Sequence, residues 1–379
     1  MIFFKNLIAE VIWLLFRYKS FNELNKGCLR ILLFSLLLLV STFSLSAQNR
    51  YISMGIKGAG NLPGESEWGQ TSSYFQTSAN MRFGVQTTGN KEWHRLYNFP
   101  KVGVGLQYTT FTNPAARELI SDFWSIYPYV SFPLVRKERF TFDAELAFGV
   151  GFGFNPWDSI NNPGNILIGT PVNAYISFGA SVDYLISDRF ELFADASLEH
   201  YSNGKLSLLN KGLNNITTSV GMRYYLNTRK IMSEKEYDIS CEKKMDFDIM
   251  WNLGYRYTGV SNNMENRVIQ AIQPTVQWTL NKRSRVGTGV DFMTYYTDNR
   301  FPMHLYRVGV VGTYEMLVGR FSGILQAGIW VYNSEGLGSF YYERAGVRYR
   351  LNDFLSLHLA IRAANLVADN IEWGLVFRI

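Results

Sequence analysis

Residues 140–154 read FTFDAELAFGVGFGF, and their strict alternation decides the fold class. The even positions are apolar throughout, whereas the odd positions carry Thr141, Asp143 and Glu145 followed by alanine and glycine alone. Successive side chains of a β-strand point to opposite faces of the sheet. This stretch therefore predicts one long strand with an apolar face and a polar, glycine-rich face. Residues 172–186 repeat the pattern.

Strands of this length indicate a membrane protein. They exceed the about five or six residues typical of soluble sheets and match a tilted strand that crosses a bilayer. Open sheet edges cannot face lipid, because their unpaired backbone groups find no water there, so such strands must close into a barrel. We therefore predict an all-β, transmembrane antiparallel β-barrel. A secreted soluble β-sandwich is the alternative, and it explains the repeated large apolar faces less well.

The first 47 residues have the layout of a secretory signal. Lys26 and Arg30 precede the apolar run 31–40, and small and polar residues follow up to Ala47, after which we expect cleavage. A single transmembrane anchor is the alternative, but the apolar run is short for one. A second apolar patch, at 11–16, leaves the true start of the leader open. A signal followed by aromatic-rich alternating strands predicts the bacterial outer membrane as the location.

The composition argues against several classes of function. The chain has 379 residues with 47% hydrophobic, 16% aromatic and 18% charged residues, which excludes a disordered chain. Its formal net charge of +6 is not gathered into a basic stripe, so no nucleic-acid partner is expected. Only four histidines and two cysteines are present, and none cluster at metal-ligand spacing. We therefore expect neither a metal site nor another cofactor.

The chain contains an internal duplication. The sequence YLISD at 184–188 resembles YRLND at 349–353, and GMRY at 221–224 resembles GLVF at 374–377. About eight candidate strands fall in residues 48–228 and a similar number in 245–379, with a charged, unpatterned linker at 229–244 between them. We predict two tandem eight-stranded barrels, the second a degenerate repeat. One sixteen-stranded barrel is the alternative, since the pattern does not reveal which strands pair.

One hairpin differs in length between the two copies. The offset between them is 165 residues at Tyr184 and Tyr349 but 153 residues at Gly221 and Gly374. The second copy has therefore lost twelve residues from this hairpin.

Loop lengths predict which way the strands run. Short turns are expected near 134–139 and 187–189, and long connections at 155–170 and 204–213. Outer-membrane barrels have short periplasmic turns and longer outer loops. The strand that ends near Ser202 should therefore point toward the cell surface, with the shortened hairpin on that side.

The motif HYSNG at 200–204 stands where this strand meets the long loop. By parity His200 and Ser202 continue the apolar, lipid-facing side of the strand, where neither is expected as a packing residue. Residues i and i+2 of a strand lie roughly 7 Å apart, so an imidazole can reach the hydroxyl and form a base–nucleophile pair. The alternative is a polar rim where the strand leaves the lipid.

Two further groups complete the candidate site. Asn214 shares the lipid-facing parity of the next strand, and a hairpin would bring it beside His200, where its side-chain oxygen could orient the imidazole. The backbone N–H groups around Asn203 and Gly204 are candidate oxyanion donors, because glycine permits close approach. In the second copy the positions equivalent to His200 and Ser202 are Asn365 and Val367, so the repeat does not need the pair in order to fold.

The motif at 200–204, together with Asn210-Lys211-Gly212, resembles the site of outer-membrane lipid A 3-O-deacylases of the PagL type, also grouped with acyloxyacyl hydrolases. The resemblance covers about residues 49–228. It implies an eight-stranded barrel whose lipid-facing histidine and serine act as general base and nucleophile on lipid A, the lipid of lipopolysaccharide in the outer leaflet. In that family an acidic residue follows the histidine by about fourteen positions. Here that position is Asn214, and the neighbouring Glu199 points into the barrel by parity.

Two functions remain open at this stage. The first is a serine esterase that removes an ester-linked acyl chain from lipid A without a cofactor, using Ser202, His200 and Asn214. The second is a non-catalytic structural barrel, or a pore if all strands form one ring, because about sixteen strands leave a water channel whereas eight are filled by side chains. A third possibility is a catalytic first half joined to an inert second barrel that serves for anchoring or partner contact.

Overall fold

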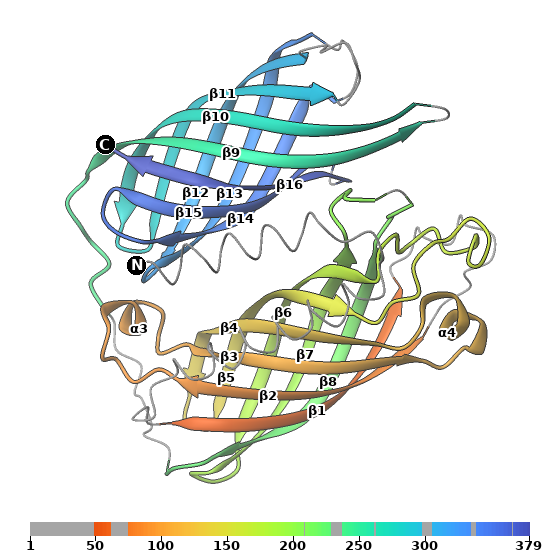
Figure 1. The fold of residues 1–379 in the computed structure, drawn as a ribbon. Helices are drawn as coiled ribbons and strands as arrows, with labels where there is room; N and C mark the ends of the chain where they lie inside the picture. The colour runs from red at the N-terminus through yellow and green to blue at the C-terminus, as the bar shows by residue number, and fades with distance from the viewer. Residues whose placement is uncertain are drawn as a thin grey trace, which may run out of the picture. The chain divides into compact units, whose positions relative to one another are not determined.

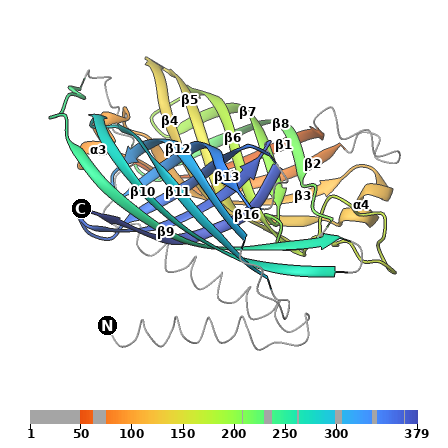
Figure 2. The same cartoon turned by 90° about the horizontal axis from the view of Figure 1, so that it is seen from above.

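The computed structural model describes residues 49–61, 75–207, 209–228, 237–260, 263–297, 305–334, 339–365 and 367–379. It contains two separately closed antiparallel barrels of eight strands each (Figures 1 and 2). The signal predicted in residues 1–47 and half of the linker predicted at 229–244 lie outside the described residues. None of the described helices has the length and apolar character needed to cross a membrane.

The first barrel closes through its first and last strands. Each strand pairs with the next in the chain, and the β1–β8 pairing runs from Tyr51 opposite Tyr225 to Asn61 opposite Asn215. The strands are β1 (Arg50–Asn61), β2 (Gln76–Gln86), β3 (Lys101–Phe111), β4 (Phe123–Lys137), β5 (Phe140–Phe152), β6 (Val172–Leu185), β7 (Phe190–Ser202) and β8 (Leu213–Tyr225). Two short helices, α3 (Glu92–Leu96) and α4 (Pro114–Ile120), lie in its connections.

The second barrel closes in the same way, with β9 paired to both β10 and β16. Its strands are β9 (Met245–Val260), β10 (Asn263–Asn281), β11 (Ser284–Thr297), β12 (Leu305–Val318), β13 (Phe321–Asn333), β14 (Tyr341–Arg350), β15 (Leu355–Ala364) and β16 (Val367–Arg378). Two tandem eight-stranded barrels are thus confirmed. The single sixteen-stranded ring is excluded, because β8 pairs with β1 and not with β9.

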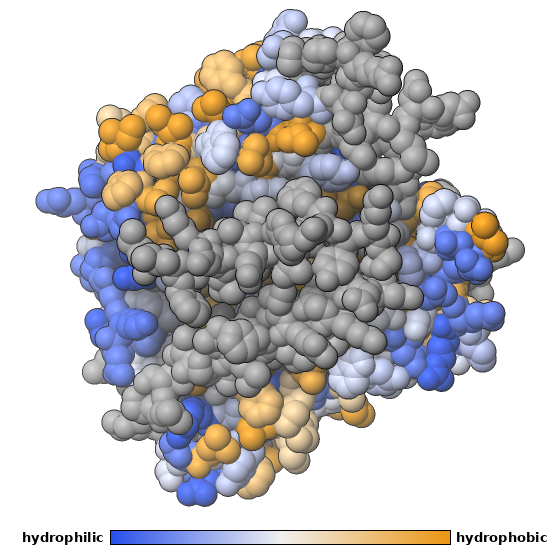
Figure 3. Space-filling view, in the orientation of Figure 1, coloured by the Kyte–Doolittle hydropathy of each residue, from blue (hydrophilic) through white to orange (hydrophobic). Residues whose placement is uncertain are grey.

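Strand parity separates lipid-facing from inward side chains as predicted. In β5, Phe140, Phe142 and Leu146 are 56%, 42% and 43% exposed, whereas Asp143 is fully buried. The strand ends at Phe152, two residues before the end of the predicted stretch. In Figure 3, apolar side chains gather along the strands of the barrel walls and hydrophilic ones toward strand ends. The apolar side chains therefore face outward, the reverse of a soluble protein and the arrangement a bilayer requires.

Charged side chains fill the lumen of the first barrel. Lys101 donates to Asp143 at 2.5 Å and also pairs with Asp183, which in turn pairs with Arg223 at 3.2 Å. All four side chains are nearly inaccessible to solvent. Buried charges are tolerated when they are paired and hydrogen-bonded, and these form ion pairs with one another across the barrel.

The lumen of the second barrel holds a similar network. Arg344 donates to Asp291 at 3.0 Å and to Glu372 at 2.8 Å, with all three side chains buried. A second group joins Arg285 to Glu315 and to Asp248. Both barrels are therefore packed with side chains rather than open, as eight-stranded barrels generally are.

Connection lengths fix the two ends of the first barrel. At one end, residues 138–139 link β4 to β5 and 186–189 link β6 to β7. At the other end the connections span 112–122, 153–171 and 203–212. The predicted turn at 134–139 is shorter than expected, because β4 continues through Lys137. Apart from 87–100, which contains α3 and links β2 to β3 at the end with the short turns, the long connections follow the strands that run in the direction of β7, in agreement with the orientation predicted for its end.

The shortened hairpin of the second barrel is visible in the strand bounds. Ten residues, 203–212, separate β7 from β8, whereas two residues, 365–366, separate β15 from β16. The rest of the twelve-residue difference comes from the shorter strand ends. Asn365 therefore sits in the turn and Val367 begins the next strand, so the second barrel has no strand position that matches Ser202.

The filled lumens predict that neither barrel conducts ions steadily. Purified full-length protein in a planar bilayer should give no stable channel current, because paired charges occupy both lumens. Single-channel recording checks this. A reproducible unitary conductance comparable to that of a porin would contradict the packing described here.

The Arg344 network predicts a large stability effect. Arg344→Ala leaves Asp291 and Glu372 buried without their cation, so the free energy of unfolding should fall by about 3–5 kcal/mol. Urea unfolding in detergent, followed by tryptophan fluorescence, measures the change. Arg320→Ala, in the exposed turn between β12 and β13, is the control and should change stability by less than about 0.5 kcal/mol.

Candidate active site

The side chains of His200, Ser202 and Asn214 meet on the lipid-facing side of the β7–β8 hairpin. His200 Nε2 lies 2.7 Å from Ser202 Oγ, and His200 Nδ1 lies 2.5 Å from Asn214 Oδ1. The imidazole thus bridges a hydroxyl and an amide oxygen. With its proton on Nδ1 donated to Asn214, Nε2 carries the lone pair that can accept the hydroxyl proton.

Strand geometry brings the three together. His200 is directly opposite Asn214 in the β7–β8 register, and Ser202 is two residues further along β7 on the same face. Around them the outward positions are apolar: Leu198 is 49% exposed and Ile216 is 46% exposed. The polar group therefore lies at the end of an apolar surface, with His200 and Asn214 half-buried and Ser202 only 3% exposed.

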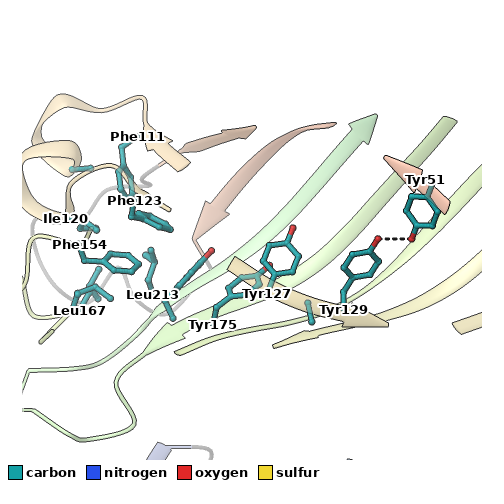
Figure 4. Close-up of a cluster of buried hydrophobic side chains, with 14 of the residues drawn as sticks. Tyr51, Phe111, Ile120, Phe123, Tyr127, Tyr129, Phe154, Leu167, Tyr175 and Leu213 are labelled. Atoms are coloured by element: carbon teal, nitrogen blue, oxygen red, sulfur yellow. Dashed lines mark hydrogen bonds between the residues drawn. The ribbon is translucent and has the colours of Figure 1, made fainter. Parts of the chain in front are cut away.

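Tyr201, between the two candidate catalytic residues, points the other way. Its side chain is fully buried in the lumen, where its hydroxyl lies 3.0 Å from Ser125 Oγ. Its ring packs against those of Phe123 and Tyr175, with centroids 5.1 and 4.9 Å away. Figure 4 shows Phe123 and Tyr175 in the cluster of buried side chains that continues along the lumen to Tyr129 and Tyr51. This cluster anchors the end of β7 from inside.

Gly212 allows the long loop to lie against the imidazole. A Cβ at this position would come within 2.7 Å of His200 Cε1, and its φ of +83° also favours glycine. The Gly212 N–H donates to the Leu167 carbonyl at 2.9 Å, and the Lys211 N–H donates to the Ile166 carbonyl at 3.3 Å. The β5–β6 connection therefore holds the loop that borders the site.

Asn165 in turn holds the β5–β6 connection. Its side-chain oxygen accepts the N–H groups of Leu167 and Ile168 at 3.1 Å, and its amide donates to the Asn155 carbonyl at 2.6 Å. Sequence reasoning did not identify Asn165 or assign a role to Gly212. The only available signals were the asparagine- and glycine-rich composition of 161–165 and the glycine that closes the motif.

Asn203 and Gly204, the two expected oxyanion residues, differ in the hydrogen-bond donors that they have available. The Asn203 backbone N–H donates to Asn210 Oδ1 at 3.0 Å, so that donor is already engaged, contrary to expectation. Within the part of the chain that the structure describes, neither atom of the Asn203 side-chain amide has a hydrogen-bond partner, although the residue is only 3% exposed. Gly204 follows with a φ of +60°, which a side chain would strain.

Glu199 does not belong to the site. It lies in the lumen as its parity predicted, where it accepts from Lys57 Nζ at 2.5 Å and from Tyr175 Oη at 2.9 Å. Across the described residues, no group of three or more His, Cys, Asp or Glu side chains is placed to hold a metal ion. The chemistry available at the site is therefore that of a serine hydroxyl beside an oriented imidazole.

Comparisons with solved structures show membrane barrels with low sequence identity. Neisserial surface protein A (NspA) is 12% identical, with a TM-score of 0.32, over 47% of this chain and 97% of that one. A de novo designed transmembrane β-barrel is 15% identical, with a TM-score of 0.25, over 35% and 95%. A triple mutant of Rhodopseudomonas blastica porin is 9% identical, with a TM-score of 0.18, over 87% and 99%. No curated protein matches the chain.

Family models match both barrels. Residues 77–223 match the model described as lipid A 3-O-deacylase (PagL), and residues 257–379 match the model described as acyloxyacyl hydrolase, C-terminal domain. The first match contains His200, Ser202 and Asn214, and the second starts within β9 and extends to the end of the chain. An outer-membrane location agrees with the apolar side chains on the outer faces of both barrels. The first barrel is thus similar to the lipid A 3-O-deacylase (PagL) family, and the second to the C-terminal domain of acyloxyacyl hydrolases.

Proposed function

We propose that this protein hydrolyses an ester-linked acyl chain of lipid A, with Ser202 as nucleophile, His200 as general base and Asn214 as the residue that orients His200. The observation that carries the proposal is the continuous contact from Asn214 through the imidazole to the Ser202 hydroxyl on a lipid-facing surface. A packing role does not account for three polar side chains joined in this order among apolar neighbours.

The reaction proceeds in two steps. Ser202 Oγ attacks the ester carbonyl carbon while His200 Nε2 takes the hydroxyl proton; the carbon–oxygen bond then breaks and the leaving alkoxide receives that proton. A water molecule then attacks the acyl-serine in the same way, and the fatty acid leaves as the serine regains its proton. An acyl ester in the outer leaflet reaches the site without leaving the membrane.

The tetrahedral intermediates need hydrogen-bond donors for their oxyanion. The Asn203 side-chain amide and the Gly204 backbone N–H are the proposed donors. Support comes from the buried Asn203 amide, which has no partner among the described residues and directly follows the nucleophile. A buried amide without a partner costs free energy unless a ligand satisfies it, and the oxyanion would do so.

Asn214 can orient His200 as a carboxylate would, but it carries no negative charge to stabilise the imidazolium. Its oxygen can fix the tautomer of His200 by accepting from Nδ1, but a neutral amide stabilises the developing imidazolium less than a carboxylate does. The proposed enzyme is therefore slower than one with an acidic residue at this position.

A non-catalytic role is proposed for the second barrel alone. It is supported by the bounds of β15 and β16, which are only two residues apart and leave no place for a counterpart of Ser202 or of the ten-residue loop beside it. A structural or partner-binding barrel fits this half of the chain.

Replacing Ser202 tests its proposed role as the nucleophile. Ser202→Ala should abolish lipid A deacylation, because no other hydroxyl contacts His200 Nε2 among the described residues, while the barrel still inserts. Mass spectrometry of lipid A from cells that express wild type or variant checks this, with heat-modifiable gel mobility as the insertion control. Deacylation that persists in the Ser202→Ala strain would eliminate the proposed role.

Replacing Asn214 tests its proposed role in orienting His200. Asn214→Asp should raise kcat by about tenfold or more, since a carboxylate stabilises the imidazolium in the transition state, and Asn214→Leu should lower it by a similar factor. The assay is release of fatty acid from lipid A in detergent micelles. Equal rates in all three proteins would show that this residue does not act through His200.

A further inference from the structure

Two glycines of the first barrel face the lipid. Among its described strands, eight other glycines would place a Cβ within 2.1–3.0 Å of neighbouring atoms, so packing in the wall or lumen requires them. Gly58 and Gly60 differ. Both have the outward parity of β1, shared with Ile56, which is 65% exposed. Among the described residues, a Cβ at Gly60 would meet nothing within 4 Å, and one at Gly58 would meet only the ring of Phe75, at 3.0 Å.

These glycines leave a furrow in the outer wall. Gly58 is opposite Thr218 and Gly60 is opposite Ile216 in the β1–β8 register. A cavity of about 290 Å³ lies over Gly58, and its outward lining residues are Ile56, Phe75, Thr77, Thr218 and Val220. The Phe75 ring lies 3.0 Å from where a Gly58 Cβ would stand and partly covers this column; we call the column and its rim the β1 furrow. Its rim is apolar and exposed, with Phe75 52% and Val220 56% accessible.

The β1 furrow is continuous with the candidate active site. Asn214 and Ile216 are successive outward residues of β8, and Ile216 borders the furrow at Gly60. Strand spacing places the furrow about 10 Å sideways from His200, two strands away, and its upper end about 7 Å along the strand from Asn214. On the outer wall, Asn214 stands between the furrow and Ser202.

We propose that the β1 furrow binds a second fatty acyl chain of the substrate, one that is not cleaved. The proposal rests on the function proposed above and names the substrate class: a lipid with several acyl chains under one headgroup. A methylene chain fits the furrow because glycine lets it approach the backbone and the rim offers only apolar and methyl-bearing side chains. Binding of a part of the substrate remote from the reacting ester orients that ester at Ser202.

The test fills the furrow with Gly60→Leu. The added Cβ meets no described atom within 4 Å, the position faces outward, and leucine is favoured over glycine in a strand, so the barrel should fold. Two substrates are compared in the same detergent: hexa-acyl lipid A and a single-chain p-nitrophenyl ester. We expect kcat/KM for lipid A to fall about tenfold, the equivalent of roughly two lost methylene contacts, mainly through KM. The rate on the single-chain ester should not change.

The matched control is Gly323→Leu in β13 of the second barrel, where an added Cβ also meets nothing within 4 Å. It should leave both rates unchanged. Equal lipid A kinetics in wild type and Gly60→Leu would overturn the proposal. The furrow would then contact only the surrounding membrane lipid and not the substrate. Equal loss on both substrates would also overturn it, because the substitution would then act on the catalytic site itself.

A binding measurement separates this proposal from the proposed function. Native mass spectrometry counts lipid A retained by Ser202→Ala and by Ser202→Ala with Gly60→Leu. Lower retention by the double variant supports the furrow even if wild type cleaves no lipid A, a result that would remove only the proposed reaction. Equal retention overturns the furrow whatever the activity.

Discussion

Closure of each sheet on itself is the constraint from which the rest of the structure follows. In hydrocarbon every backbone N–H and C=O needs a partner within the protein, and a sheet meets this demand only when its first and last strands pair. The chain does so twice, through β1 with β8 and β9 with β16. Because each ring has eight strands, each lumen is narrow enough for side chains to fill, and the charged networks around Lys101 and Arg344 occupy that space.

A closed barrel has two chemically different faces, and the candidate site uses both. His200 and Ser202 are presented to lipid on one side of β7, while Tyr201 between them is held in the aromatic cluster on the other. The outward side provides access to a membrane substrate. The inward side provides rigidity, because the Tyr201 ring and hydroxyl are both fixed. The site is therefore built on a regular strand end, and the loop that borders it is held by Gly212 and Asn165.

Much of this architecture could be predicted from the sequence. Period-two alternation in residues 140–154 predicted membrane strands, and the duplication predicted two barrels, because both depend on local pattern. The contacts of His200 with Ser202 and Asn214 followed from parity and a hairpin register. Strand pairing between the repeats could not be predicted, since a period of two is the same for eight or sixteen strands. The engagement of the Asn203 N–H by Asn210 and the support from Asn165 depend on loop conformation, which no periodicity reports.

The alternation of β7 has one more consequence. Shifting a strand by one residue against its neighbours exchanges its two faces. A β7 that paired one residue out of register would bring Tyr201 to the lipid and turn His200 and Ser202 into the lumen. Such a molecule could still form a closed ring of hydrogen bonds, yet its serine would no longer lie on the outward face of the strand. Turnover would thus depend only on the fraction of molecules assembled in the native register.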